Sequence, residues 1–382
     1  MTAFVFETCG DIRCAPGLLD ALDEDLCTRL GPRVLLVTDG GVRAAGLTQG
    51  VERSLRARSE LAVFDGVEAD PSLSTVQAAC AMAREIGATG VIAVGGGSPM
   101  DVAKVVALLL GSDQKIDGMW GVRQASGPRV PLVLAPTTAG TGSEVTPVAI
   151  ITVGADEKRG VVSPHCLPDV ALLDPRATLG LPCATTAATG IDAMVHAIEA
   201  YTSRAANANP ISRGLACQAL TLLGAHIHRA VEVPQDIEAR TGMLLGSMLA
   251  GQAFANAPVA AVHALAYPIG GRFHVPHGLS NALVLAEVMR FNLASARDEY
   301  AALAPHAFAH LHGQSNLAER FIEALADLSP AFGLPTRLRA LDIPHAACAE
   351  MAAAAMGQTR LLVNNPRPVV EADARAIYEA VW

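Results

Sequence analysis

The chain of 382 residues lacks several features that would place it in a class at once. Its eight cysteines form no C-x-x-C pair, which argues against a zinc ribbon or a disulfide framework and favours reduced thiols in the cytoplasm. No block of basic residues stands out and the formal net charge is −9, so we expect neither nucleic acid nor an anionic membrane as a partner. The N-terminal segment MTAFVFETCGDIR contains no basic region followed by an apolar run and does not predict a signal peptide.

Residues 241–271 contain no Asp, Glu, Lys or Arg, which raises the question of a transmembrane helix. Polar side chains such as Gln252, Asn256 and His263, together with two prolines, interrupt this segment. A buried pair of helices therefore explains the segment better than a membrane span.

Apolar residues make up 51% of the chain, enough for a sizeable core divided between two domains. In the first half, short apolar runs alternate with helical patterns such as residues 71–86. Because the apolar runs show no polar alternation, they predict parallel strands covered by helices on both faces. These runs are residues 34–39, 91–94 and 131–135, with further candidates at 148–152 and 170–173.

After about residue 180 the strand-like runs stop and alanine-rich and leucine-rich helical patterns continue to the end of the chain. The segment Leu179-Gly180-Leu181-Pro182 is the expected boundary. The sequence therefore predicts an α/β domain over residues 1–180 and an α-helical domain over residues 181–382.

A glycine-rich run, Gly95-Gly96-Gly97-Ser98, joins the expected strand at 91–94 to a helix. Glycines let the backbone approach a diphosphate, and a helix N-terminus offers free N–H groups and the positive end of a dipole. Met100 stands where the third glycine of G-x-G-x-x-G would be, so a tight strand-to-helix turn without a ligand is the alternative.

Two further segments are candidates for the same nucleotide. Asp39, at the end of a strand, can accept both ribose hydroxyls and would favour NAD over NADP, although it can also be a turn aspartate before Gly40 and Gly41. Because Asp39 precedes the glycine run, the topology would be a variant of the usual Rossmann order. Residues 136–146 are rich in hydroxyls and could wrap a nucleotide or form a solvated loop.

Asp192 and His196 have i, i+4 spacing in residues 190–199, a helical pattern for which Thr189 is the expected N-cap. A carboxylate and an imidazole on adjacent turns can bind one divalent ion. The alternatives are a capping box formed by Thr189 and Asp192, and a buried structural histidine.

His263 and His277 flank a segment broken by prolines and glycines, so each is expected near a helix end. Facing Asp192 and His196, they would complete a site of three histidines and one carboxylate, which suits Fe²⁺ or Zn²⁺ better than Mg²⁺. A rival cluster has no carboxylate in register and is typical of a solvated helix face. It comprises His306, His310 and His312; His226, His228 and His274 are read in the same way.

Several motifs, in order from about residue 39 to 368, resemble those of the iron-containing (group III) alcohol dehydrogenases. Residues 95–101 resemble GGGSxxD, 136–146 resemble PTTxGTGSEVT, 190–199 resemble GxDxxxHAxE, 263–278 resemble HxxxHxxGxxxxxPHG, and 365–368 resemble NPRP. The resemblance implies a dehydroquinate synthase-like architecture, in which residues 1–180 form a Rossmann-like dinucleotide-binding domain with a parallel sheet and residues 181–382 form an all-α metal-binding and catalytic domain.

The resemblance also implies the site residues. The metal ligands would be Asp192, His196, His263 and His277. The cofactor contacts would be Asp39, Gly96, Gly97, Ser98, Asp101, Thr137, Thr138, Thr141, Ser143 and Lys158.

Tyr267 is a departure from the family, which often has a histidine four residues after the third metal ligand. A phenol can relay a proton or position an oxygen, but it titrates near pH 10 when unperturbed. We expect Tyr267 and Phe254 to be the catalytic and pocket-lining residues, with ordinary aromatic packing as the alternative for Phe254.

The resemblance implies a metal-dependent, NAD(H)-linked alcohol dehydrogenase or aldehyde reductase, in which the metal polarises the substrate oxygen and hydride passes to the nicotinamide. We expect Fe²⁺, with Zn²⁺ as the alternative, small alcohols or aldehydes as substrates, and a cytoplasmic homodimer. The alternative functions are a maleylacetate-type reductase or polyol dehydrogenase of the same fold, a dehydroquinate synthase-like lyase, and a non-enzymatic binding protein.

Overall fold

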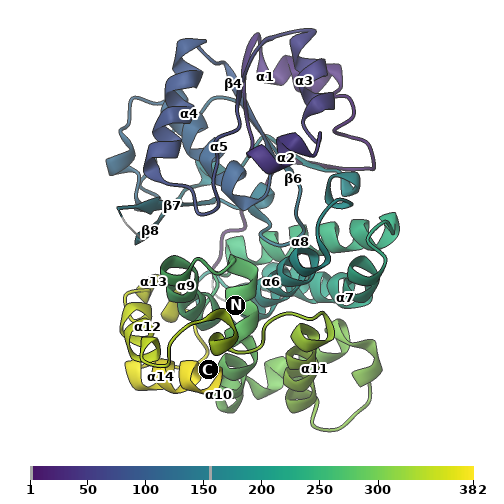
Figure 1. Cartoon of the computed structure of the whole chain (residues 1–382), viewed down its shortest axis with the longest axis vertical. Coiled ribbons are helices and arrows are strands. Elements are labelled where there is room, and N and C mark those ends of the chain that lie inside the picture. The colour runs from purple at the N-terminus through teal and green to yellow at the C-terminus, as the bar shows by residue number, and fades with distance from the viewer. Residues whose placement is uncertain (1–2, 155–156) are drawn as a thin grey trace. The chain divides into compact units, whose positions relative to one another are not determined.

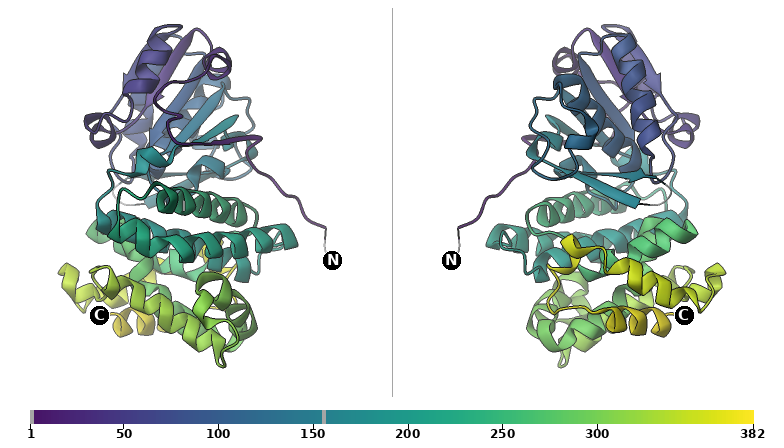
Figure 2. Two further views of the ribbon diagram at one scale, coloured as in Figure 1. Left: turned by 90° about the vertical axis from the view of Figure 1, so that its right-hand side faces the viewer. Right: turned by 90° about the vertical axis from the view of Figure 1, so that its left-hand side faces the viewer.

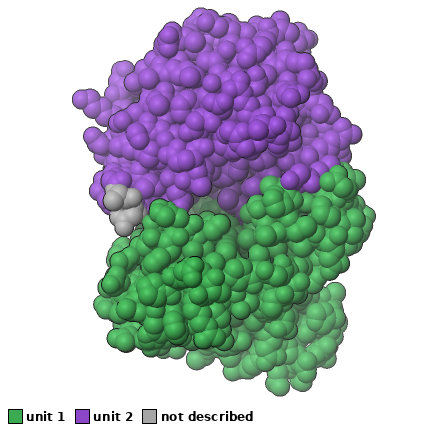
Figure 3. Space-filling view, viewed as in Figure 1, with its two compact units in different colours: residues 1–6, 181–382 green, residues 7–180 purple. Residues whose placement is uncertain are grey.

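The computed structural model describes residues 3–154 and 157–382. Two compact units divide the chain: one is Glu7–Gly180, and the other combines Met1–Phe6 with Leu181–Trp382 (Figure 3). The backbone N–H of Val5 donates to Asn207 Oδ1 over 2.9 Å, which attaches the N-terminal segment to the second of these units.

A parallel sheet of six strands forms the centre of the unit Glu7–Gly180 (Figure 1). In sheet order its strands are β1 (Asp11–Cys14), β9 (Val170–Leu173), β6 (Leu132–Pro136), β4 (Gly90–Gly95), β2 (Arg33–Val37) and β3 (Glu60–Phe64). The predicted strands at 34–39, 91–94, 131–135 and 170–173 are confirmed. The sequence did not predict β1 and β3, whose residues are only partly buried and of mixed polarity.

Helices cover both faces of this sheet (Figure 2). Leu35 and Val37 of β2 pack into one core, whereas Val34 and Leu36 of the same strand pack into the other. Both faces of each central strand are therefore apolar, which is why the strand sequences show no polar alternation. The helices are α1 (Glu24–Leu30), α2 (Gly40–Ala44), α3 (Gln49–Arg56), α4 (Leu73–Glu85) and α5 (Gly97–Gly111), with 3₁₀ turns η1 (Ile116–Gly118), η2 (Ser143–Val145), η3 (Pro164–Cys166) and η4 (Pro175–Thr178).

A second sheet has the order β5-β8-β7. It consists of β5 (Gly121–Val122), β8 (Glu157–Val162) and β7 (Val148–Val153), and β7 pairs with β8 in antiparallel fashion. The strand expected at 148–152 therefore exists, and it belongs to this second sheet and not to the parallel one. Hydrophobicity shows that a strand is buried, not which neighbour it pairs with, and the polar sequence of β8 gave no strand signal.

The second unit is helical, and no strand occurs in the part of it that the structure describes. Its helices are α6 (Cys183–Thr202), α7 (Pro210–Glu232), α8 (Ile237–Asn256), α9 (Ala261–Phe273), α10 (His277–Ala307), α11 (Leu317–Ala331), α12 (Ala347–Ala355), α13 (Thr359–Leu362) and α14 (Glu371–Ala380), with 3₁₀ turns η5 (Ala309–Leu311) and η6 (Leu338–Leu341). Residues 241–271 lie on α8 and α9, as predicted. Among the described residues, no helix has the length and apolar character needed to cross a membrane.

The start of α6 corrects one expectation. The helix begins at Cys183 after Pro182, so Thr189 lies in its second turn and is not its N-cap. The Thr189 hydroxyl donates instead to the carbonyl of Thr185 over 2.8 Å. This also excludes the capping box with Asp192, and the earlier start went unnoticed because Ala-Thr-rich residues 183–188 carry no amphipathic pattern.

The rival histidine cluster is not on one helix. α10 ends at Ala307, so His306 belongs to α10 and His310 belongs to η5. Phe308 between them has an extended backbone, with φ −134° and ψ 94°. The i, i+4 spacing of the two histidines therefore does not place them on one helical face.

Candidate metal centre and nucleotide loops

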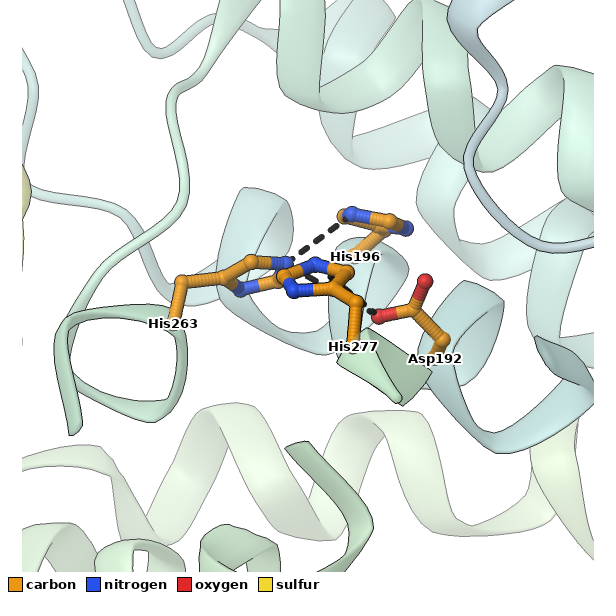
Figure 4. A group of neighbouring side chains, drawn as sticks. All are labelled: Asp192, His196, His263 and His277. Carbon is orange, nitrogen blue, oxygen red and sulfur yellow. Dashed lines mark hydrogen bonds and ion pairs between the residues drawn. The ribbon is translucent and has the colours of Figure 1, made fainter. Parts of the chain in front are cut away.

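Three helices bring the four predicted metal ligands together (Figure 4). Asp192 and His196 lie on α6, His263 lies in the first turn of α9, and His277 is the first residue of α10. One ligand atom from each residue lies within 4.8 Å of the others. Among the described residues this is the only such group of His, Cys, Asp or Glu side chains. The expectation that His263 and His277 lie near helix ends is confirmed.

The distances within the group fit one small cation. His196 Nε2 lies 3.0 Å from His263 Nε2, and Asp192 Oδ1 lies 3.9 Å from His263 Nε2 and 3.8 Å from His277 Nε2. The side chains of Asp192, His196 and His263 are buried, whereas the His277 side chain is 40% exposed. The group therefore has one side chain that solvent can reach.

Gly278 explains how α10 comes close enough to α6. A Cβ atom at Gly278 would lie 2.6 Å from the carbonyl oxygen of Ala188, one turn before Asp192 on α6. A side chain at this position would force the helices apart, because real Cβ atoms do not approach an oxygen this closely. The glycine therefore permits the contact that places His277 beside Asp192.

Glu199 fixes the orientation of His263. Its carboxylate accepts from the backbone N–H groups of Ala260 and Val262 over 2.9 and 2.7 Å, and its Oε2 lies 2.7 Å from His263 Nδ1. Because an ionised carboxylate can only accept, His263 Nδ1 is the donor and Nε2 keeps its lone pair. Nε2 is the atom that faces the other ligands. Glu199 thereby holds the start of α9 and the tautomer of the histidine together.

Asn281 lies against the same group, one turn after His277 on α10. Its Nδ2 donates to Asp192 Oδ1 over 2.6 Å and lies 3.3 Å from both His263 Nε2 and His277 Nε2. Two N–H groups thus face three acceptors, while the buried Oδ1 has no partner.

The residues present fit a divalent cation of the Fe²⁺ or Zn²⁺ type. Burial alone would raise the pKa of Asp192, but the three histidines and the Asn281 amide hold the pKa below its ordinary value. The carboxylate is therefore ionised, and three imidazoles complete a nitrogen and oxygen donor set typical of these metals. The two Nε2 atoms of His196 and His263 also face each other, a contact that a shared proton or a cation must stabilise.

Two aromatic residues border the group. The Phe254 ring stacks on His196, with centroids 4.4 Å apart and an interplanar angle of 22°. The Tyr267 ring lies 6.0 Å from that of His277. Both residues named from the sequence therefore lie beside metal-ligand candidates, Phe254 as a cover over one imidazole and Tyr267 near the more exposed one.

In the other unit, the glycine run has the predicted strand-turn-helix form. β4 ends at Gly95, Gly96 is the N-cap of α5, and α5 begins at Gly97. Cβ atoms at Gly96 and Gly97 would lie 3.7 Å and 3.0 Å from side-chain atoms of Thr138 and Thr141 respectively. The glycine turn and the hydroxyl-rich loop are thus side by side.

Asp39 caps a helix. It is the N-cap of α2, and its Oδ1 accepts from the backbone N–H of Val42 over 2.9 Å. This agrees with the turn-aspartate alternative and leaves ribose binding as a hypothesis. Lys158, on β8, forms an ion pair with Asp70 at 2.5 Å.

Asp101 and Ser143 are engaged within the protein. The Asp101 carboxylate accepts from the Ser143 hydroxyl over 2.7 Å and from the backbone N–H of Ile150 over 2.8 Å. Burial raises the pKa of Asp101, although Lys104 opposes this effect. These bonds connect α5 with the segment that begins β7.

Comparison with known proteins decides the family. Residues 10–175 match the family model described as iron-containing alcohol dehydrogenase, and residues 186–382 match that of the C-terminal part of the Fe-containing alcohol dehydrogenase family. The chain belongs to the iron-containing alcohol dehydrogenase family. It is accordingly a metal- and NAD-dependent oxidoreductase of the alcohol dehydrogenase and aldehyde reductase type.

Relatives of this alcohol dehydrogenase match over nearly the whole chain. Long-chain-alcohol dehydrogenase 1 of Geobacillus thermodenitrificans is 41% identical over 377 residues, covering 96% of this chain and 93% of the relative. A crystal structure of 1,3-propanediol oxidoreductase has 35% identity and a TM-score of 0.93, with both chains covered completely. The NAD⁺ complex of sulfoacetaldehyde reductase from Bifidobacterium kashiwanohense has 27% identity and a TM-score of 0.87, covering 100% of this chain and 99% of that chain. These matches confirm the predicted fold, an N-terminal α/β domain with a parallel sheet followed by a helical domain.

Sequence reasoning missed three polar residues of this alcohol dehydrogenase: Glu199, Asn281 and Lys104. Two of them could have been found from spacing, because Glu199 follows His196 at i, i+3 and Asn281 follows His277 at i, i+4. Lys104 gave no such signal, since a lysine on a helix is ordinarily solvated.

Proposed function

We propose that this alcohol dehydrogenase interconverts a primary alcohol and its aldehyde through the four residues Asp192, His196, His263 and His277, which hold Fe²⁺, with Zn²⁺ as the alternative. The observation that supports the proposal is the convergence of one carboxylate oxygen and three imidazole nitrogens within 4.8 Å. When bound there, such a cation supplies a Lewis acid for the oxygen of the alcohol or aldehyde.

The protein's own side chains prepare this site. Asp192 contributes the negative charge, and Glu199 keeps the Nε2 lone pair of His263 directed at the group. Phe254 covers the His196 ring and excludes water from that side. Tyr267, beside His277, is our candidate for relaying a proton or positioning the substrate oxygen.

The unit Glu7–Gly180 is the dinucleotide-binding domain in this proposal, and Leu181–Trp382 is the metal-binding and catalytic domain. The start of α5 provides free N–H groups and a positive dipole end for the diphosphate of NAD. When bound there, the nicotinamide would supply the acceptor or donor of the hydride exchanged with the carbinol carbon. The remaining contacts proposed for the nucleotide come from Asp39, Gly96, Gly97, Ser98, Asp101, Thr137, Thr138, Thr141, Ser143 and Lys158.

The substrates we propose are small primary alcohols and aldehydes. The similar proteins are named for long-chain alcohols, 1,3-propanediol and sulfoacetaldehyde, all of which are alcohols or aldehydes. A panel of such compounds with NADH and NADPH, extended to polyols and maleylacetate, separates this proposal from the other substrate classes.

The test compares His263→Ala with His228→Ala, a matched change at a histidine whose side chain is 52% exposed. Both proteins are loaded with Fe²⁺ without oxygen, and bound metal and NADH oxidation with an aldehyde are measured. We expect His263→Ala to lose most of its metal and at least 100-fold in turnover, and His228→Ala to match the parent. A fully active, metal-free His263→Ala protein would contradict the proposal.

We also propose that the enzyme is a cytoplasmic homodimer. All eight cysteines are free thiols, as expected for a reducing compartment. The alanine-rich helical domain is compatible with self-association, and light scattering coupled to gel filtration tests it directly.

A further inference from the structure

Lys104 is a buried cation that the proposed reaction does not use. It lies on α5 and is completely inaccessible to solvent. Its Nζ donates to Ser143 Oγ and to the Val148 carbonyl, each over 2.7 Å, and to Thr146 Oγ1 over 3.2 Å. Three donors thus meet three acceptors, all from the segment 143–148. Burying an ammonium group is costly, so this pattern indicates a specific task for it.

Asp101 completes the arrangement from the preceding turn of α5. Its Oδ1 lies 3.8 Å from Lys104 Nζ, and its two oxygens accept from Ser143 Oγ and from the Ile150 N–H. Helix α5 therefore binds residues 143–150 through a carboxylate and an ammonium group that share Ser143. We call Asp101, Lys104 and Ser143 the α5 clamp.

The α5 clamp secures one end of the hydroxyl-rich loop, and the glycine turn secures the other. At the beginning of the loop, the Thr137 N–H donates to the Gly95 carbonyl over 2.9 Å. Between these two attachments lie residues 138–142, which contain Gly140 and end at Gly142 with a positive φ of 57°. Glycine tolerates this conformation and also leaves the backbone many alternatives, so the ends must be fixed for the loop to hold one shape.

We propose that Lys104 is a positioning residue for the nicotinamide nucleotide, and that the α5 clamp holds residues 138–142 in the form that binds it. This inference rests on the proposed function, in which the glycine turn and Thr137, Thr138 and Thr141 contact NAD. It adds a second role for Asp101 and Ser143, because their polar atoms bond to each other, to Lys104 and to Ile150 besides the nucleotide contacts proposed above. A preorganised loop binds more tightly because less entropy is lost on binding.

The direct test is Lys104→Met, which keeps much of the side-chain volume and removes the ammonium group. NADH affinity is measured by fluorescence titration of the metal-free protein, and metal binding is measured separately by chelator competition. We expect at least 10-fold weaker NADH binding with unchanged metal affinity. Lys115→Met is the matched control, since Lys115 is exposed at the start of η1, and it should bind NADH as the parent does.

Steady-state kinetics distinguish positioning from a general loss of structure. In Lys104→Met we expect the KM for NADH to rise at least 10-fold, while kcat at saturating NADH and the KM for the aldehyde stay within about 2-fold. If Lys104→Met does not fold, Thr146→Val removes one acceptor with little change in shape and should weaken NADH binding several-fold. Thr146→Ser restores the hydroxyl and should restore the affinity.

Two outcomes overturn the inference: a folded Lys104→Met protein with parental NADH affinity, or a Thr146→Val protein that binds NADH as tightly as Thr146→Ser. Failure of the proposed function looks different. In that case the parent protein itself binds no NADH, whatever residue stands at position 104.

Discussion

Glu199 Oε2 lies 2.7 Å from His263 Nδ1, and this contact determines which nitrogen of the imidazole faces Asp192, His196 and His277. The same carboxylate accepts two backbone N–H groups at the start of α9. One side chain therefore sets the position of a helix and the protonation pattern of a ligand on it.

Replacing Glu199 with glutamine should weaken metal binding by 10- to 100-fold, because an amide has one acceptor oxygen for three donors and presents N–H groups of its own. Competition with a chromophoric chelator measures the affinity. Glu232→Gln is the control, since the Glu232 side chain is 68% exposed. Equal affinities in the two variants would show that Glu199 does not orient His263.

Gly278→Ala should damage the same site through sterics alone. The added Cβ would lie 2.6 Å from the Ala188 carbonyl oxygen, so α10 must move away from α6. We expect a loss of about 1–3 kcal/mol in unfolding free energy, together with weaker metal binding, because His277 moves with the helix.

Gly214→Ala is the control for this substitution. No atom lies within 4 Å of a Cβ at Gly214, which is on α7. Alanine there should stabilise the helix by about 0.5–1 kcal/mol. Thermal unfolding and chelator competition are measured on both variants, and a Gly278→Ala protein with parental values would mean that the two helices are not packed as described.

The sequence predicted some residues of the metal centre and not others, because only some of them are related by spacing along one helix. Asp192 and His196 share a helix, so their spacing alone placed them together. His263 and His277 are brought to them by packing of α9 and α10, which spacing cannot reveal and which family resemblance supplied. Asn281 follows His277 by one helical turn, so spacing places it on the same face of α10, but its contact with Asp192 forms only once α6 and α10 are packed.

In the fold, likewise, the sequence predicted which strands are buried but not which strands pair. Leu35 and Leu36 of β2 face different cores, and their unbroken hydrophobicity correctly predicted a strand covered on both sides. Ile150 of β7 carries the same kind of signal but pairs with Gly160 in a different sheet. Pairing depends on partners distant in the chain, including the Asp101 carboxylate that accepts the Ile150 N–H.

Asp39 can be tested for its two roles separately. Asp39→Asn retains an N-cap side chain for α2 and removes the negative charge. If the carboxylate accepts the ribose hydroxyls of NAD, this variant should shift the NADP-to-NAD preference in kcat/KM by at least 10-fold towards NADP with little loss of stability. If the cofactor preference is unchanged in Asp39→Asn and stability falls in Asp39→Ala, the role of Asp39 is to cap α2.

Glu144 should make stability depend on pH. Burial raises the pKa of its carboxyl group to about 7, and Oε1 has no partner. Since the folded protein holds this proton more tightly than the unfolded chain does, the stabilisation is fully present below about pH 4.5 and is lost as pH rises to about 7. This rise in the pKa of Glu144 corresponds to at most about 3 kcal/mol of unfolding free energy.

Glu144→Gln mimics the protonated acid and should remove this dependence. Chemical unfolding of both proteins at pH 5 and pH 8 measures the effect. We expect similar stability at pH 5 and a more stable variant at pH 8. A stability difference that does not change between the two pH values would show that Glu144 does not titrate in this range.

The His277 side chain is 40% exposed, whereas the other three members of its group are buried within packed helices. The imidazole of His277, the first residue of α10, is therefore the ligand at which solvent reaches the group. We therefore expect iron to enter and leave the folded enzyme, so that a chelator can strip it and added Fe²⁺ can reconstitute it without denaturant.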